Sequence, residues 1–141
     1  MTYREMRESH QKRYNESGMF FAFSEHQFVQ EMVKRGLHPI NDTDKIMRVA
    51  FGGYILKQDE DNFEKIVDQC HHEMWENISE DKTGLGFILD MFREELANHE
   101  FSVTYDASDA LCSLGITSLD LKRSYPLRHG LGVAMAEIFA A

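Results

Sequence analysis

The chain of 141 residues carries 24 acidic and 15 basic side chains, which gives a formal net charge of −9, and 43% of its residues are hydrophobic. This length and apolar fraction favour a single globular domain over residues 1–141 and exclude a fully disordered chain. The acid excess argues against a general nucleic-acid binder that follows the phosphate backbone. Two cysteines are too few for a disulfide framework, which favours a reducing compartment.

The N-terminal part begins with a strongly helical pattern. Residues 2–17 are rich in Arg, Lys, Glu and Gln, and the spacing predicts a helix that ends at Gly18 and that could form a peripheral arm. No apolar signal region follows the N-terminus, so we expect a cytoplasmic protein without a membrane segment. The apolar run 19–23 fits either a short buried strand or the end of a buried helix.

The next segment contains a well-marked helix and an extended region. Ser24 and Gln27 have the spacing of a capping box, so a helix is predicted to begin at Ser24 and to end at Gly36. Residues 46–56 are apolar and are interrupted by Gly52 and Gly53. This pattern predicts two short strands with a kink or turn between them.

The C-terminal part is dominated by helical periodicity. Apolar residues recur at three- and four-residue steps over 59–79 and again over 84–99, which predicts two helices, the second of them central. Residues 101–105 alternate and predict a short strand. Three further helices are expected, one that ends at Gly115, one that begins at Thr117 and one that begins at Tyr125. The fold class predicted is α+β and predominantly α-helical, with five to seven helices and a small sheet of short strands.

Most of the negative charge falls on one predicted helix. Residues 58–81 hold nine acids and one base, Lys65. With the apolar residues directed inward, the acids would form a negative stripe about 30 Å long. Such a stripe fits either a solvated helix face or a docking face for a basic protein surface. The contact residues predicted for a docking face are Asp61, Glu64, Asp68, Glu76 and Glu80, helped by Asp81, Glu94 and Glu95.

A second hypothesis is a metal site between two helices. His72 and Glu76 are i,i+4 neighbours on one helix, and Glu95 and His99 are i,i+4 neighbours on the next. If the two helices pack antiparallel, the four side chains could form a His₂Glu₂ site in a metal-binding protein or a metal-dependent hydrolase. The chain has no nucleophile-elbow serine and no phosphate-binding glycine loop, so we assign no catalytic residue and no cofactor.

Four short stretches carry a resemblance to a known group of proteins. They are residues 19–24, 52–57, 81–88 and 95–100. These stretches resemble an uncharacterised family of small phage and mobile-element proteins, over most of the chain from Met19 onward. The resemblance implies a role in phage–host conflict, where acidic proteins include inhibitors of CRISPR nucleases that occupy nucleic-acid-binding clefts.

Together these observations favour a non-enzymatic interaction protein in the cytoplasm of a bacterial host. Its expected partner is a basic surface on a host protein, in the most specific version a CRISPR nuclease, with no direct contact to nucleic acid. A third hypothesis is a structural or regulatory homo-oligomer that forms through the N-terminal helix.

Overall fold

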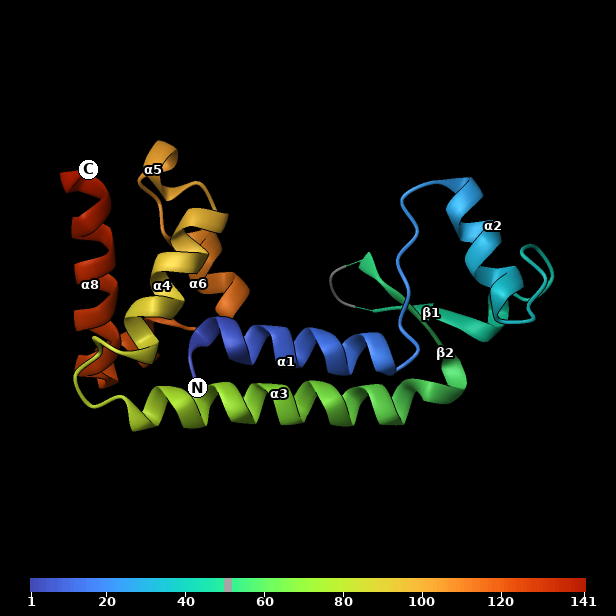
Figure 1. Ribbon diagram of the computed structural model, residues 1–141, viewed down its shortest axis with the longest axis horizontal. Helices are drawn as coiled ribbons and strands as arrows, with labels where there is room; N and C mark the ends of the chain where they lie inside the picture. Colours follow the sequence, from blue (N-terminus) through green and yellow to red (C-terminus); the bar gives the residue numbers. More distant parts are fainter. Residues whose placement is uncertain (50–51) are drawn as a thin grey trace. The chain divides into compact units, whose positions relative to one another are not determined.

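The computed structural model describes residues 1–49 and 52–141, and its contacts divide the chain into two compact units (Figure 1). Met1–Arg7 and His72–Ala141 form the first, called here the helical unit, and Glu8–His71 form the second, called the sheet unit. Two helices, α1 (Tyr3–Glu16) and α3 (Glu60–Glu80), contribute residues to both units.

The prediction of a mostly helical chain with a small sheet is confirmed. Helices account for 70% of the chain, and the described residues contain eight α-helices and one antiparallel sheet of two strands. None of these helices is long and apolar enough to cross a membrane.

The sheet unit is built around a short hairpin. Strand β1 (Ile46–Arg48) pairs with β2 (Tyr54–Leu56), with Ile46 opposite Leu56, and Phe20 adds an isolated bridge to Tyr54. The 3₁₀ turns η1 (Thr43–Lys45) and η3 (Lys57–Asp59) flank the two strands. The predicted extended segment also contains Ala50 and Phe51, which lie outside the described residues.

Helix α2 (Glu25–Lys34) completes the sheet unit and begins and ends where the sequence predicts. The Ser24 side chain accepts a hydrogen bond from the backbone N–H of Gln27 at 3.1 Å, and Gly36 has a φ of 74°, in the left-handed region. The side chain of Gln27 accepts from the N–H of Phe23, one residue before the N-cap. The unit's core joins α2 to the hairpin and consists of Phe20, Met32 and Ile46, with Phe28, Leu37, Tyr54 and Leu56 packed against it.

The helical unit is centred on α4 (Phe87–Asn98), which packs along α8 (Tyr125–Ala140). Its other helices are α5 (Phe101–Thr104), α6 (Ser108–Leu114) and α7 (Ser118–Arg123). The expectation of a central helix is met, because the buried face of α4 includes side chains with no exposed surface at all. The most buried core side chains are Ile88, Met91, Phe92, Leu96, Phe101 and Leu127.

The strand predicted over residues 101–105 is wrong, because this segment forms the single helical turn α5. Glu100 and Tyr105 flank the turn with φ values of 56° and 54°, and the N–H groups of Val103 and Thr104 donate to the Glu100 carbonyl. Phe101 is buried, whereas Val103 and Tyr105 are exposed. The apolar alternation therefore does not correspond to one buried face of a strand.

Candidate functional site

Three of the predicted contact residues lie on the part of α3 that belongs to the sheet unit. Asp61, Glu64 and Asp68 are all exposed, and the helical repeat places them within an arc of about 60°. Within residues 1–49 and 52–141, none of these three carboxylates takes part in an ion pair or a hydrogen bond. We call this set, Asp61, Glu64 and Asp68, the α3 acidic face.

Glu76 and Glu80 lie on the part of α3 that belongs to the helical unit, and both are exposed. Glu76 lies 3.0 Å from His72 Nε2, in a pair in which both side chains are more than half exposed. Pairs of this kind at i,i+4 contribute only a few tenths of a kcal/mol, about 0.3–0.5. Glu76 and Glu80 therefore remain accessible to solvent and to a partner.

Asp81 has a structural role, which the prediction of a contact residue missed. Its carboxylate accepts hydrogen bonds from the N–H groups of Gly84, Gly86 and Ile88, each at 3.0 Å. Burial alone would raise the pKa of Asp81, but these three donors outweigh it and lower the pKa. The loop that Asp81 organises also explains why α4 begins at Phe87, three residues later than predicted.

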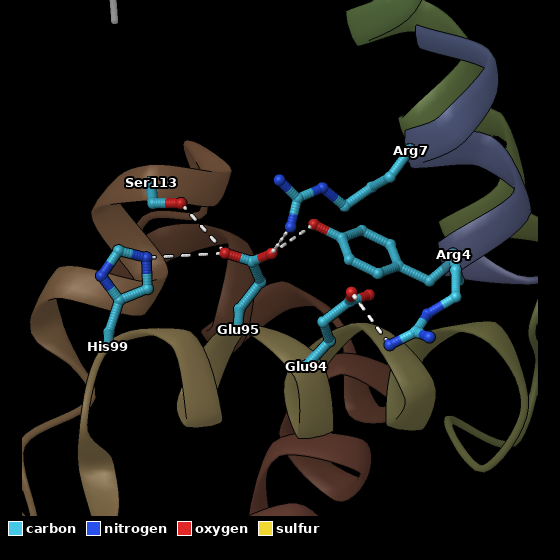
Figure 2. A network of polar contacts seen from close by, with 7 residues as sticks. Arg4, Arg7, Glu94, Glu95, His99 and Ser113 are labelled. Carbon is cyan, nitrogen blue, oxygen red and sulfur yellow. Dashed lines mark hydrogen bonds and ion pairs between the residues drawn. The ribbon is translucent and has the colours of Figure 1, made fainter. Parts of the chain in front are cut away.

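Glu95 lies at the centre of a buried polar network in the helical unit (Figure 2). Glu95 is buried, with only 4% of its surface exposed to solvent. Oε1 accepts hydrogen bonds from the Tyr3 hydroxyl and from Arg7 Nη1, both at 2.9 Å. Oε2 accepts from the Ser113 hydroxyl at 3.2 Å and lies 3.5 Å from His99 Nε2. The network connects the first turns of α1 to α4 and α6.

This burial overturns the prediction that Glu95 is a contact residue. Both of its oxygens accept hydrogen bonds from groups within the unit, and a buried carboxylate without partners would be strongly destabilising. Burial, and then the negative charge of Glu95, raise the pKa of Tyr3 far above its ordinary value, so Tyr3 stays a neutral donor. The neighbouring Glu94 is partly exposed and lies 3.8 Å from Arg4 Nη2 (Figure 2).

The alternative metal site is not assembled. The pairs His72–Glu76 and Glu95–His99 form separately, and no group of three or more His, Cys, Asp or Glu side chains in the described part of the chain could hold a metal ion. Glu95 also has both oxygens engaged by Tyr3, Arg7 and Ser113. A His₂Glu₂ site from these four residues therefore does not fit this structure.

The partners of Glu95 were not predicted, although one local signal pointed to its burial. Glu95 lies three residues after Phe92 and seven after Ile88, which places it on the apolar face of α4. An acid on such a face needs a buried donor. The donors come from distant segments, with Tyr3 separated from Glu95 by 92 positions, and no local pattern identifies them.

A pocket of ≈ 380 Å³ lies beside the C-terminal end of α3, next to the start of α8. Asp81 and Asp120 both line it, but each carboxylate accepts hydrogen bonds from backbone N–H groups at the start of a helix. Asp120 and Thr117 form a capping box at the start of α7, the helix that the sequence predicts to begin at Thr117. Lys82 donates to the Ser79 carbonyl at 2.8 Å. These charged groups are thus explained by the local fold.

A family model matches residues 2–137, nearly the whole chain. The chain belongs to a family of unknown function, DUF7659. No curated protein and no solved structure gives a significant match to the chain. The description of this family names no activity.

Proposed function

We propose that this member of the DUF7659 family is a non-enzymatic interaction protein that binds a basic surface of another protein through the α3 acidic face. The observation that carries the proposal is that Asp61, Glu64 and Asp68 are exposed and form no hydrogen bond or ion pair with the other described residues. In contrast, Asp81 caps a helix and Glu95 anchors α1. The three acids of the α3 acidic face contribute neither a cap nor a buried ion pair.

The arrangement of these acids has a small cost to the fold. Asp61 and Glu64 are three residues apart, and Glu64 and Asp68 are four apart, so each pair places like charges side by side on the helix. Lys65 lies four residues after Asp61 and three before Asp68, so it offsets part of this repulsion. Like-charge pairs at these spacings destabilise a helix by roughly 0.2–0.5 kcal/mol each. A basic partner would relieve this repulsion and would be drawn in quickly at low salt.

More specifically, we propose that the protein is a phage-encoded inhibitor that acts in the bacterial cytoplasm. The partner would then be the positively charged nucleic-acid-binding cleft of a CRISPR nuclease. This form is supported by the resemblance of residues 19–24, 52–57, 81–88 and 95–100 to small phage proteins, together with the acidic face itself. Because carboxylate groups can pair with the same Lys and Arg side chains as phosphate groups, an acidic helix would occupy such a cleft in place of the nucleic acid.

The experiment is capture of host proteins on immobilised full-length chain, with a charge-reversed variant, Asp61→Lys/Glu64→Lys/Asp68→Lys. The matched control is Glu8→Lys/Glu25→Lys/Asp44→Lys, which reverses three exposed acids elsewhere in the sheet unit. We expect basic partners to be recovered by the wild type and the control but not by the first variant. Recovery of the same partners by both variants, or of none by the wild type, would contradict the proposal.

The specific form has its own test. Purified CRISPR nucleases loaded with guide RNA are assayed for DNA cleavage in the presence of the wild type or the charge-reversed variant. Inhibition by the wild type alone is the expected result. If a captured partner is bound through the α3 acidic face but no nuclease is inhibited, the proposed role as an interaction protein is supported. The proposed inhibition of a CRISPR nuclease is then contradicted.

A further inference from the structure

Three large apolar side chains, on and beside α5 and at the end of α8, are exposed in the helical unit. They are Val103, Tyr105 and Phe139, which are 75%, 61% and 58% exposed, and we call this set the aromatic patch. The Tyr105 and Phe139 rings lie 5.2 Å apart between centroids, and Phe139 also packs edge-on against the buried Phe101 at 5.7 Å. The two rings are thus fixed on the core where α5 meets the end of α8.

The backbone that presents the patch is strained. Glu100 and Tyr105, at the two ends of α5, both have left-handed backbone conformations, and they are the only non-glycine residues with positive φ within residues 1–49 and 52–141. This conformation costs roughly 1–2 kcal/mol for a residue with a Cβ atom. Strain of this kind is concentrated at binding sites. Val103, between the two strained positions, and Tyr105, at the second of them, are both exposed.

The surroundings of the patch are acidic. Between Asn98 and Ser108 the sequence contains two acids and no Lys or Arg. Glu100 and Asp106 flank α5 directly, and both are exposed. Glu137 of α8 is already neutralised by Arg93, with a distance of 2.8 Å between Arg93 Nε and Glu137 Oε2.

We propose that the aromatic patch is a docking site for a basic amphipathic segment of a partner protein. Its apolar side chains would cover Val103, Tyr105 and Phe139, and its Lys or Arg side chains would lie beside Glu100 and Asp106. Exposed aromatic rings held on a rigid core are typical centres of binding energy. The acidic surroundings supply charge complementarity and favour a basic partner over an acidic one.

The same charges disfavour other occupants. In a two-fold dimer of this chain the patch would meet its own copy, which would bring Glu100 and Asp106 of the two chains together. An anionic membrane surface would be repelled by these carboxylates. The inference uses residues of the helical unit only, so it holds whether or not the α3 acidic face of the sheet unit binds a partner.

The test measures fluorescence anisotropy of three labelled peptides with the full-length chain. The first peptide alternates Lys with Leu and Trp at helical spacing, the second replaces Lys by Glu, and the third replaces Leu and Trp by Ser. We expect the first to bind at least about tenfold more tightly than the other two. Tyr105→Ser and Val103→Ser are each expected to weaken this binding about tenfold, whereas Leu119→Ser, on the exposed surface of α7, leaves it unchanged.

Several outcomes would overturn the proposal. The first is that Tyr105→Ser and Val103→Ser bind the first peptide as tightly as the wild type does. The second is that the wild type binds the Glu-containing peptide as tightly as the Lys-containing one. Loss of binding only in the charge-reversed variant of the α3 acidic face would place the peptide elsewhere. A dimer by light scattering that dissociates in Tyr105→Ser would make a second copy the occupant. Circular dichroism verifies folding, and Val103→Ser keeps the test decisive because Val103 is 75% exposed and its replacement is not expected to disturb the core.

Discussion

Gly130 of α8 lies so close to Gly84 that a Cβ atom on Gly130 would be 2.5 Å from the Gly84 carbonyl oxygen. The same atom would lie 2.6 Å from Cγ2 of Ile88, a core residue of α4. Gly84 itself has a φ of 82°, which residues with side chains rarely adopt. This contact lets α8 approach the loop that leads into α4, and the loop is the one that Asp81 organises.

We predict that Gly130→Ala destabilises the protein although alanine is the better helix former. Backbone and a packed Ile88 cannot move aside easily, so overpacking should cost about 1–3 kcal/mol in the free energy of unfolding. The matched control is Gly132→Ala in the same helix, where an added Cβ meets nothing within 4 Å. That change should stabilise by about 0.5–1 kcal/mol. Urea denaturation measures both, and shifts of the same sign would contradict the close contact.

Asp81→Asn is predicted to destabilise the protein by about 1–2 kcal/mol at neutral pH, because a charged acceptor of three backbone N–H groups is replaced by a neutral one. The pKa of Asp81 is lower in the folded state than its ordinary value of 3.8. Its contribution is therefore fully present above that ordinary value and is lost as the pH falls through the folded pKa. When urea midpoints are measured between pH 2 and pH 7, the variant should lose less stability on acidification than the wild type does.

The control for this prediction is Asp68→Asn, which removes an exposed carboxylate that caps no described backbone group. We expect it to change the free energy of unfolding by less than about 0.5 kcal/mol. If Asp81→Asn behaves like Asp68→Asn across the whole pH range, Asp81 does not organise the loop.

Tyr3→Phe is predicted to cost about 1–2 kcal/mol, because it removes one donor to the buried Glu95 carboxylate and keeps the ring. Tyr125→Phe, at an exposed position on α8, is the control and should be nearly neutral. A double-mutant cycle with Glu95→Gln should give a coupling of about 0.5–3 kcal/mol between residues 3 and 95. Strictly additive effects of the two substitutions would show that the hydroxyl and the carboxylate do not interact.

Elements with local signals were the predictable part of the fold. The Ser24 cap, the Thr117–Asp120 capping box and the periodicity of α3 are all encoded within a few residues, and the structure has each of them. The short hairpin was also predictable, because Gly52 and Gly53 separate two apolar segments. Such features depend on backbone groups and side chains that are close in sequence.

What could not be predicted depends on contacts between distant segments. From the sequence, Glu95 is one of several acids expected at the surface. Its buried position depends on Tyr3 and Arg7, which reach it only when the start of α1 packs on α4. Residues 101–105 alternate like a strand, yet Phe101 is held in the core and the flanking residues turn the chain back. Tertiary packing there overrides the local preference for extended structure.

The strain at α5 gives a last prediction, that Glu100→Asn stabilises the fold by up to about 1 kcal/mol. Asparagine tolerates the left-handed conformation that Glu100 adopts at a φ of 56°, since its short side chain bonds locally. The same substitution in a right-handed helix, Glu76→Asn, should instead destabilise by about 0.5 kcal/mol through helix propensity. Urea denaturation compares the two, and equal losses would show that no strain is stored at residue 100. Because Glu100→Asn also removes a charge beside the aromatic patch, a more stable variant that binds the basic peptide less well is the expected combination.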